Sequence, residues 1–360
     1  MNWIMRVCCA CGLMTATCAV VAAEPAFAQV EPGYRMEFPR DDAAHLRFHT
    51  EWWYVTGWLQ RPSGEPLGFQ ITFFRRRPGT QEGNPSQFAA KQVLFAHAAI
   101  SDPGRQRLLR AEKAARVGFG LAYAREQTLD VAIDDWSLRR ESGGSFRSIA
   151  TGDDFAFDLS LEPTQAPLLH GSAGYSRKSP QQGSASYYYS LPHLRVSGSI
   201  QVGQQRQTVS GEAWLDHEWF ASFLDDASYG WDWLGANLDD GGALMISRIR
   251  DAQGAPRWAF ATWRSAAGGV RTFAPDQIEW LPGRHWRSPA TGVEYPVEWT
   301  LRVGERTLRV RPLMDDQEND TRATTGTLYW EGASRVLDER GRLIGRGYLE
   351  LTGYGERLGM

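Results

Sequence analysis

Two short clusters place imidazole, carboxyl and indole side chains at alternating positions along the chain. In the first, His49, Glu51 and Trp53 would share one face of a strand, and Trp52 and Tyr54 would share the other. His49 and Glu51 would then be neighbouring polar groups on an otherwise apolar face, which is one way to place a polar site in an apolar cavity. The alternative is a His–Glu hydrogen bond that only satisfies two buried side chains.

In the second cluster, a strand would place His217 and Trp219 on one face and Trp214, Asp216 and Glu218 on the other. A neutral imidazole can act as an acid or a base near pH 7, and an indole face can stabilise positive charge. We therefore predict catalytic roles for His217 and Trp219, with His49 and Glu51 as a second polar station. The alternative for His217 is a core histidine with one backbone partner.

Asp232 lies between Trp231 and Trp233, so on a strand it faces away from both. In an apolar wall its carboxyl group would have a raised pKa and could donate a proton. An exposed carboxylate is the equal alternative. We expect the ligand-binding walls to be built from four indoles and one imidazole: Trp53, Trp214, Trp231, Trp233 and His97.

Metal and cofactor chemistry find little support in the sequence. His49, Glu51, His97 and His217 could converge, but the chain has no His-x-x-x-His pair, Cys/His array or Asp-rich calcium loop. Its glycines form neither a phosphate-binding loop nor a dinucleotide fingerprint, and no Gly-x-Ser-x-Gly elbow occurs. We expect no metal and no cofactor.

The composition of the 360 residues is globular, with 42% hydrophobic and 22% charged residues. Lys and Arg number 39 against 42 Asp and Glu, a net charge of −3, so nothing favours a nucleic-acid partner. Aromatic residues are abundant, with 15 Trp, 12 Tyr and 16 Phe. An apolar small molecule is the partner that we expect; the oligomeric state stays open.

Residues 1–28 have the pattern of a secretory signal peptide, with one early positive charge, an apolar stretch, and an Ala-x-Ala cleavage site ending at Ala28. We expect a periplasmic or secreted protein without stable membrane insertion after cleavage. A retained anchor, or lipidation at Cys18, is the alternative. All four cysteines precede Ala28, so a mature chain would have neither disulfides nor thiolate sites.

Period-two alternation dominates the chain and predicts an all-β fold. The clearest strand has Phe155, Phe157, Leu159 and Leu161 on one face. Comparable segments are 50–59, 68–75, 92–100, 194–202, 207–220, 229–238, 243–250, 257–264, 297–303 and 307–313, with tight turns expected at 239–242 and 252–254. Only 106–116 has a helix-like composition, and 171–186 is expected to be a long loop. Many antiparallel strands with almost no helix indicate a sandwich or barrel.

The best seam between two halves lies near 222–227, where Asp225 and Asp226 interrupt two aromatic runs. We therefore predict an N-terminal domain over 29–221 and a C-terminal domain over 222–360. The strand at 50–56 carries large aromatics on both faces, which is typical of a strand placed between two layers or where two barrels meet.

Four motifs, in order, resemble the AttH and carotenoid 1,2-hydratase (CrtC, hydroxyneurosporene synthase) family over essentially the whole mature chain. They are His49-Thr50-Glu51-Trp52-Trp53-Tyr54-Val55-Thr56-Gly57, Gly211-Glu212-Ala213-Trp214-Leu215-Asp216-His217-Glu218-Trp219, Tyr329-Trp330-Glu331-Gly332 and Gly347-Tyr348-Leu349-Glu350-Leu351-Thr352-Gly353-Tyr354. The resemblance implies two consecutive lipocalin-like antiparallel β-barrels with a ligand cavity associated with the barrels and their interface.

Carotenoid hydratases add water to an isoprenoid double bond without a cofactor, and their His-x-Trp pair matches His217 and Trp219. The hydratase branch also has a Tyr and an Asp on a following strand. The corresponding stretch here, Leu244-Met245-Ile246-Ser247, has neither. Asp232 is a weak substitute for the missing acid. Two hypotheses therefore stand: a cofactor-independent hydro-lyase acting on an isoprenoid, carotenoid or lipid-like substrate, and a non-catalytic carrier of such a ligand.

A third, weaker hypothesis is sugar recognition by tryptophan. Sugar stacking needs exposed indoles, whereas a lipid pocket needs buried ones, so the exposure of Trp52, Trp53, Trp219 and Trp233 separates the two.

Overall fold

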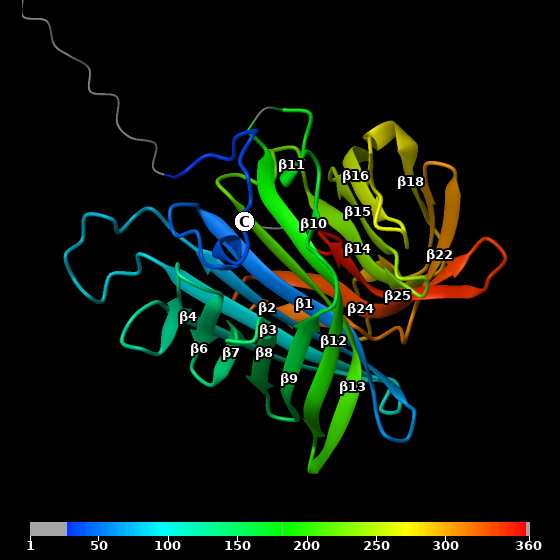
Figure 1. Ribbon diagram of the computed structural model, residues 1–360, viewed down its shortest axis with the longest axis horizontal. Helices are drawn as coiled ribbons and strands as arrows, with labels where there is room; N and C mark the ends of the chain where they lie inside the picture. The colour runs from blue at the N-terminus through cyan, green and yellow to red at the C-terminus, as the bar shows by residue number, and fades with distance from the viewer. Residues whose placement is uncertain (1–26, 182, 358–360) are drawn as a thin grey trace, which may run out of the picture.

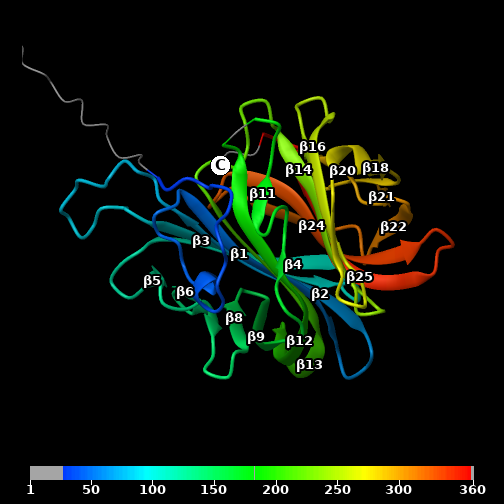
Figure 2. The same cartoon turned by 45° about the horizontal axis from the view of Figure 1, so that its top comes forward.

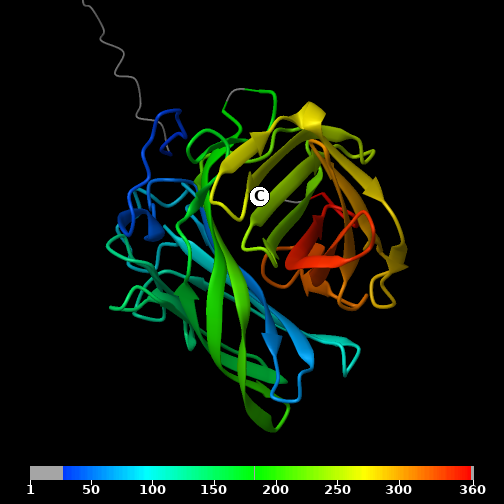
Figure 3. The ribbon, with the colours of Figure 1, turned by 45° about the vertical axis from the view of Figure 1, so that its right-hand side comes forward.

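The computed structural model describes residues 27–181 and 183–357, so most of the predicted export signal lies outside the described residues. Two large antiparallel sheets, each curled into a nearly closed barrel, make up almost the whole structure (Figures 1 and 3). The predicted all-β fold with two lipocalin-like barrels is therefore confirmed. Among the described residues, no helix is long and apolar enough to span a bilayer.

The first sheet has 13 strands, in the order β4-β3-β2-β1-β13-β12-β9-β8-β7-β6-β5, with β10 and β11 paired to β12. The barrel nearly closes where β6 lies against β3 and β4. Its strands are β1 (Thr50–Gln60), β2 (Pro66–Arg76), β3 (Val93–Asp102), β4 (Arg107–Arg116), β5 (Ala122–Ala124), β6 (Asp130–Ile133), β7 (Trp136–Arg140), β8 (Phe146–Thr151), β9 (Phe155–Pro163), β10 (Leu168–Leu169), β11 (Tyr175–Arg177), β12 (Ala185–Val202) and β13 (Gln205–Phe220).

The second sheet has 10 strands, in the order β17-β16-β15-β14-β25-β24-β22-β21-β18, with β23 paired to β24. Its strands are β14 (Gly230–Leu238), β15 (Ala243–Arg250), β16 (Pro256–Arg264), β17 (Val270–Phe273), β18 (Ile278–Pro282), β21 (Trp299–Val303), β22 (Arg306–Pro312), β23 (Glu318–Thr321), β24 (Thr327–Asp338) and β25 (Leu343–Thr352). Strands β19 (His285–Arg287) and β20 (Glu294–Pro296) form a separate hairpin. The two short 3-10 helices are η1 (Arg40–Asp42) and η2 (Pro275–Gln277).

The expected tight turns are present. Gly241 and Gly254 have φ values of +88° and +80°, in the region that favours glycine, and they follow β14 and β15. The helix expected over 106–116 is wrong, because this segment is β4, paired along its length with β3. The helix-favouring composition is overridden by this pairing at the edge of the barrel. The expected loop at 171–186 contains β11 and the start of β12.

Side chains on the two faces of β1 enter different cores, as the alternation predicts. Trp53 and Val55 belong to the core inside the first barrel. Trp52, Tyr54 and Trp58 belong to a separate aromatic core between the barrels. The barrels lie side by side, with β1 against β25 and β2 against β24 (Figure 2). One strand therefore supports the interior of one barrel and also the interface with the other.

The barrels approach closely at Gly68 on β2. A Cβ atom there would lie 2.6 Å from Cβ of Ala333 on β24 and 2.8 Å from the Tyr348 hydroxyl on β25. Only a residue without a side chain allows this approach.

Candidate functional site

A buried polar cluster occupies the interior face of β1 and β13. The Glu51 carboxylate is fully buried, and its Oε1 accepts hydrogen bonds from Nδ1 of His45 at 2.7 Å and Nε2 of His217 at 2.9 Å. Its Oε2 accepts one from Nε of Arg75, also fully buried, at 2.9 Å. Burial alone would raise the pKa of Glu51, but Arg75 and the two imidazoles outweigh it and hold this pKa well below its usual range.

His217 and Trp219 share this interior face, as predicted, because Trp53 pairs with His217 and Glu51 pairs with Trp219 across the two strands. Burial lowers the pKa of His217 to about 4, although Glu51 acts in the opposite direction. The imidazole is therefore neutral near pH 7. His45 stacks on the Trp219 indole with ring centroids 3.9 Å apart.

The residue that joins Glu51 is His45, so the prediction that His49 lies beside Glu51 is wrong. His49 precedes β1, its Nδ1 accepts a hydrogen bond from the Thr50 hydroxyl at 2.9 Å, and its ring packs on Phe27. Strict alternation does not apply before the strand begins. His45 lies outside the alternating pattern, and nothing in the local sequence marks it.

His45, Glu51 and His217 place potential ligand atoms within 4.8 Å of one another, which is close enough to hold a metal ion. Oε1 of Glu51, however, also accepts a hydrogen bond from the His45 backbone amide at 3.0 Å, and Oε2 is ion-paired with Arg75. A cation at this place would also face the Arg75 guanidinium. The donor set fits a saturated ion-pair network better than a metal site.

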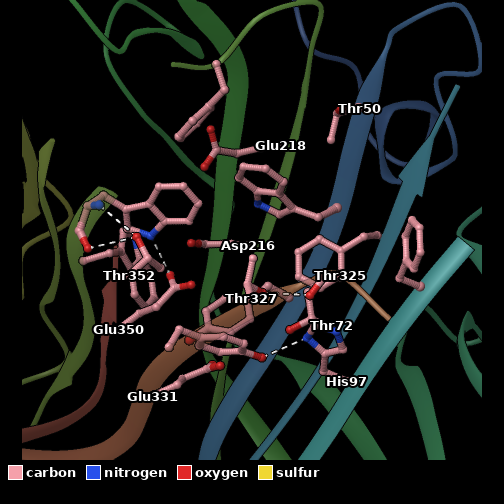
Figure 4. A pocket seen from close by; sticks show the side chains of 18 of the residues that line it. Thr50, Thr72, His97, Asp216, Glu218, Thr325, Thr327, Glu331, Glu350 and Thr352 are labelled. Carbon is pink, nitrogen blue, oxygen red and sulfur yellow. Dashed lines mark hydrogen bonds between the residues drawn. The ribbon is translucent and has the colours of Figure 1, made fainter. Parts of the chain in front are cut away.

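A cavity of about 220 Å³ lies between the barrels, on the opposite face of the same two strands (Figure 4). Aromatic side chains from both barrels and several threonines form its walls: Trp52, Tyr54, Phe74, Phe95, Phe223, Trp231, Trp233, Phe260, Tyr329, Thr50, Thr72, Thr324, Thr325, Thr327 and Thr352. Four carboxyl groups, two from each barrel, also line it: Asp216, Glu218, Glu331 and Glu350. We call this space the interface cavity.

Glu331 on β24 and Glu350 on β25 are direct cross-strand partners. Burial raises the pKa of Glu350 to about 7 and that of Glu331 well above its usual value, and the negative charge of Glu350 raises the pKa of Glu331 further. Oε2 of Glu350 accepts a hydrogen bond from Nε1 of Trp231 at 3.0 Å. Oε1 of Glu331 has no hydrogen-bond partner in the described part of the chain. The pair therefore holds at least one proton at neutral pH.

Asp216 differs from this pair because donors surround it. Burial raises its pKa to about 7, against the effect of hydrogen bonds from Ser190, from the Tyr188 hydroxyl at 2.6 Å and from Nε1 of Trp214 at 2.6 Å. Both carboxyl oxygens are thus occupied. Asp216 is positioned to fix the Tyr188 and Trp214 side chains rather than to exchange a proton with a ligand.

Glu218 pairs with the buried Lys178, whose Nζ lies 2.8 Å from its Oε2. Three aromatic rings surround the ammonium group, with centroids between 4.4 and 4.9 Å from Nζ: those of Tyr188, Phe223 and Phe260. Burial lowers the pKa of Lys178 and raises that of Glu218.

His97 lies on the cavity wall, where we expected a ligand-binding residue. Its Nδ1 is 2.9 Å from the Tyr329 hydroxyl and its Nε2 is 3.2 Å from the Thr324 hydroxyl, and both partners belong to the second barrel. Burial lowers the pKa of His97 to about 3, so the ring is neutral.

The other predicted residues divide between the cavity and the barrel interiors. Trp231 and Trp233 line the cavity. Trp214 belongs to the aromatic core behind it, and Trp53 stacks on His217 inside the first barrel. Asp232 lies within the second barrel. None of His49, Glu51, His217 and Trp219 lines the cavity.

Asp232 is neither an exposed carboxylate nor a solitary acid in an apolar wall. It is fully buried and lies 2.5 Å from Nη2 of Arg248 and 2.9 Å from Nε of Arg250. Its Oδ1 also accepts a hydrogen bond from the Tyr354 hydroxyl at 2.8 Å. Arginine and tyrosine donors thus occupy both carboxyl oxygens, so this geometry does not support a proton donor.

The acidic residues of the cavity were not identified as a site from the sequence. Alternation places Asp216 and Glu218 on the face opposite His217, but it does not show which part of the chain packs on that face. Glu331 and Glu350 each occur in a Tyr-x-Glu sequence, at Tyr329 and Tyr348, inside two of the motifs quoted above. A repeated Tyr-x-Glu in adjacent strands is the signal that could have found them.

The indoles of Trp52, Trp53, Trp219 and Trp233 are 8%, 1%, 0% and 6% exposed. Buried indoles favour an apolar pocket over a surface that stacks sugars, so the carbohydrate hypothesis is not supported.

Comparison with known proteins agrees with this architecture. The crystal structure of a proposed AttH from Nitrosomonas europaea is 49% identical, covers 91% of this chain and 100% of its own, and superimposes with a TM-score of 0.86. Kievitone hydratase from Nectria haematococca, at 16% identity, shares the fold with a TM-score of 0.67, over 91% of this chain and 95% of its own. A search of curated proteins finds no match. The AttH-like family model matches residues 29–354, and the chain belongs to this family.

Proposed function

We propose that the interface cavity binds an apolar, unsaturated small molecule of the isoprenoid, carotenoid or lipid class, and that the Glu331–Glu350 pair supplies the proton for cofactor-independent addition or removal of water. The observation that carries the proposal is the pair itself: two glutamates directly opposite each other in an aromatic cavity, with pKa values raised by burial. A neutral carboxylic acid in a dry site is the group that alkene protonation requires.

The reaction would begin when the protonated carboxyl group transfers its proton to one alkene carbon and leaves a carbocation at the other. The Trp52, Trp231 and Trp233 indoles line the same space and can stabilise the positive charge through their faces. Water then adds to the cation, and the glutamate takes back one proton from the added water. The net change is one water added across the double bond, with the carboxyl group regenerated.

The hydratase that shares this fold supports the reaction class. Catalysis by the interior cluster around His217 would require the ligand to enter the first barrel. Since His217 is fully buried and hydrogen-bonded to Glu51, we assign the interior cluster a positioning role for β1 and β13.

The test uses acyclic isoprenoid alkenes, with myrcene as the first probe, incubated with the protein in H₂¹⁸O. Hydration by the wild-type protein and loss of hydration in Glu350→Gln, with probe binding retained, is the expected result. Glu305→Gln, at an exposed turn, is the matched control. Binding of the probes without any mass change would overturn the enzymatic proposal and leave the second candidate, a carrier whose aromatic cavity holds its ligand unaltered.

We also propose export, on the sequence pattern of residues 1–28 alone. Intact mass measurement of the protein from a periplasmic fraction would give a chain that begins at Gln29.

A further inference from the structure

A second pocket, of about 280 Å³, lies farther along the same seam between the barrels. The interface cavity is lined by alternate residues of β1, from Thr50 to Tyr54, whereas the second pocket is lined by 56–60 of the same strand. On β25, Glu350 and Thr352 line the interface cavity, and Leu343, Arg346, Gly347 and Tyr348 line the second pocket. The side chains of Trp214 and Trp233, packed edge to face at 6.5 Å, lie between the two spaces. The proposed function does not use this second pocket.

Two arginines place positive charge in the second pocket. Arg335 on β24 and Arg346 on β25 are direct cross-strand partners, and both line the pocket. Their guanidinium carbons lie 5.6 and 5.7 Å from the centroid of the Trp58 ring, so both groups are gathered over one indole. Like charges placed opposite each other on a sheet are destabilising unless something compensates them.

Among the described residues, no carboxylate pairs with Arg335 or Arg346. Within residues 27–181 and 183–357, neither guanidinium forms an ion pair or a side-chain hydrogen bond. The one acidic residue of the pocket, Glu212, is held 2.6 Å from Nδ1 of His193. A hydrogen bond holds the Trp58 indole in place, because its Nε1 donates to the backbone oxygen of Gly347 at 3.0 Å.

We propose that this pocket is a binding site for a small organic carboxylate, whose charged group lies between Arg335 and Arg346 and whose apolar part contacts Trp58 and the half-exposed Leu343. Guanidinium groups recognise a carboxylate through paired N–H donors, and two of them on adjacent strands provide such donors from two sides. Bound carboxylate would also remove the repulsion between the two arginines. The site is separate from the proposed proton donor and does not depend on it.

The experiment is isothermal titration calorimetry of the full chain with benzoate at low ionic strength. Benzyl alcohol, the uncharged analogue, tests the need for charge. We expect benzoate to bind and benzyl alcohol to bind at least about tenfold more weakly, because one charge-assisted hydrogen bond corresponds to roughly that factor. Arg335→Gln and Arg346→Gln should each weaken benzoate binding by a similar factor.

The matched control is Arg306→Gln, which removes an arginine packed 4.5 Å from the Trp263 ring on the same barrel but outside both cavities. It should leave benzoate affinity unchanged. Melting temperatures without benzoate give the second readout: Arg346→Gln should match or exceed the wild type, because repulsion is relieved. Equal binding of benzyl alcohol and benzoate, or unchanged benzoate affinity in both arginine variants, would overturn the proposal.

Discussion

Replacement of Glu350 by Gln should remove part of the pH dependence of stability, because the pKa of Glu350 is raised in the Glu331–Glu350 pair. The unfolded carboxyl group loses its proton near its ordinary pKa of 4.5, whereas burial raises the pKa of Glu350 in the fold to about 7. Between these two values the folded protein binds more protons than the unfolded chain. The wild-type stability therefore falls as pH rises through this window.

The magnitude can be worked from the same values. Each pH unit between the unfolded and folded pKa corresponds to about 1.4 kcal/mol, so Glu350 costs the fold about 3 kcal/mol by pH 8 relative to pH 4.5. Gln cannot ionise and can keep the hydrogen bond from Trp231 through its carbonyl oxygen. Relative to the wild type, Glu350→Gln should therefore gain about 3 kcal/mol in free energy of unfolding between pH 4.5 and pH 8.

The assay is guanidinium chloride unfolding at several pH values from 4.5 to 8, with ΔG extrapolated to water. The comparison must be a difference between variants, because other buried groups such as Asp216 and His217 also titrate with shifted pKa values. Glu305→Gln reports the effect of losing one exposed carboxylate. A constant difference between Glu350→Gln and the wild type over this range would refute the protonated pair and, with it, the proposed acid.

Three further predictions concern other parts of the structure. Arg75→Met leaves the Glu51 carboxylate buried without its ion pair, so it should destabilise the fold by about 3–5 kcal/mol in the same unfolding assay. The control is Arg302→Met, which removes an exposed ion pair with Glu279 and should cost less than about 1 kcal/mol. His217→Ala should lower the melting temperature but change the affinity of a cavity probe such as myrcene less than about twofold, because His217 does not line the cavity. A large loss of affinity would show that His217 contributes to the binding site. Gly68→Val should cost about 1–3 kcal/mol, because its Cβ would meet Ala333 and Tyr348, and a neutral outcome in thermal unfolding would show that the barrels can separate there.

Much of the fold could be predicted because period-two alternation is a local property. The strand pattern at 207–220 correctly assigns His217 and Trp219 to one face, and the pattern at 50–59 separates Trp53 from Trp52; that the two strands pair and bring Trp53 beside His217 was not predicted. The prediction of a helix at 106–116 failed because residues such as Leu, Arg, Ala, Glu and Lys favour a helix in isolation. Only the pairing with β3 makes this segment a strand.

The site was harder to predict because it lies between barrels. Alternation assigns a residue to a face, but it does not say what packs on that face. Asp216 was therefore placed correctly on the face opposite His217 without any indication that Glu350, from a strand more than a hundred residues later, would share the same cavity. His45 precedes its strand, so no periodic signal could place it beside Glu51.

The position of the acid follows from how the barrels are filled. Inside the first barrel, core residues such as Trp53 and Phe73 leave no more than 1% of their surface exposed, so the described interior has little space for a ligand. The outer faces of β1, β13, β24 and β25 meet in a seam that still holds a cavity, and the Glu331–Glu350 pair is tolerated there because it retains at least one proton. An apolar ligand that displaces water from this cavity makes ionisation of Glu331 and Glu350 still less favourable. Binding therefore takes up protons and tightens as pH falls through about 7, whether the bound molecule is then hydrated or only carried.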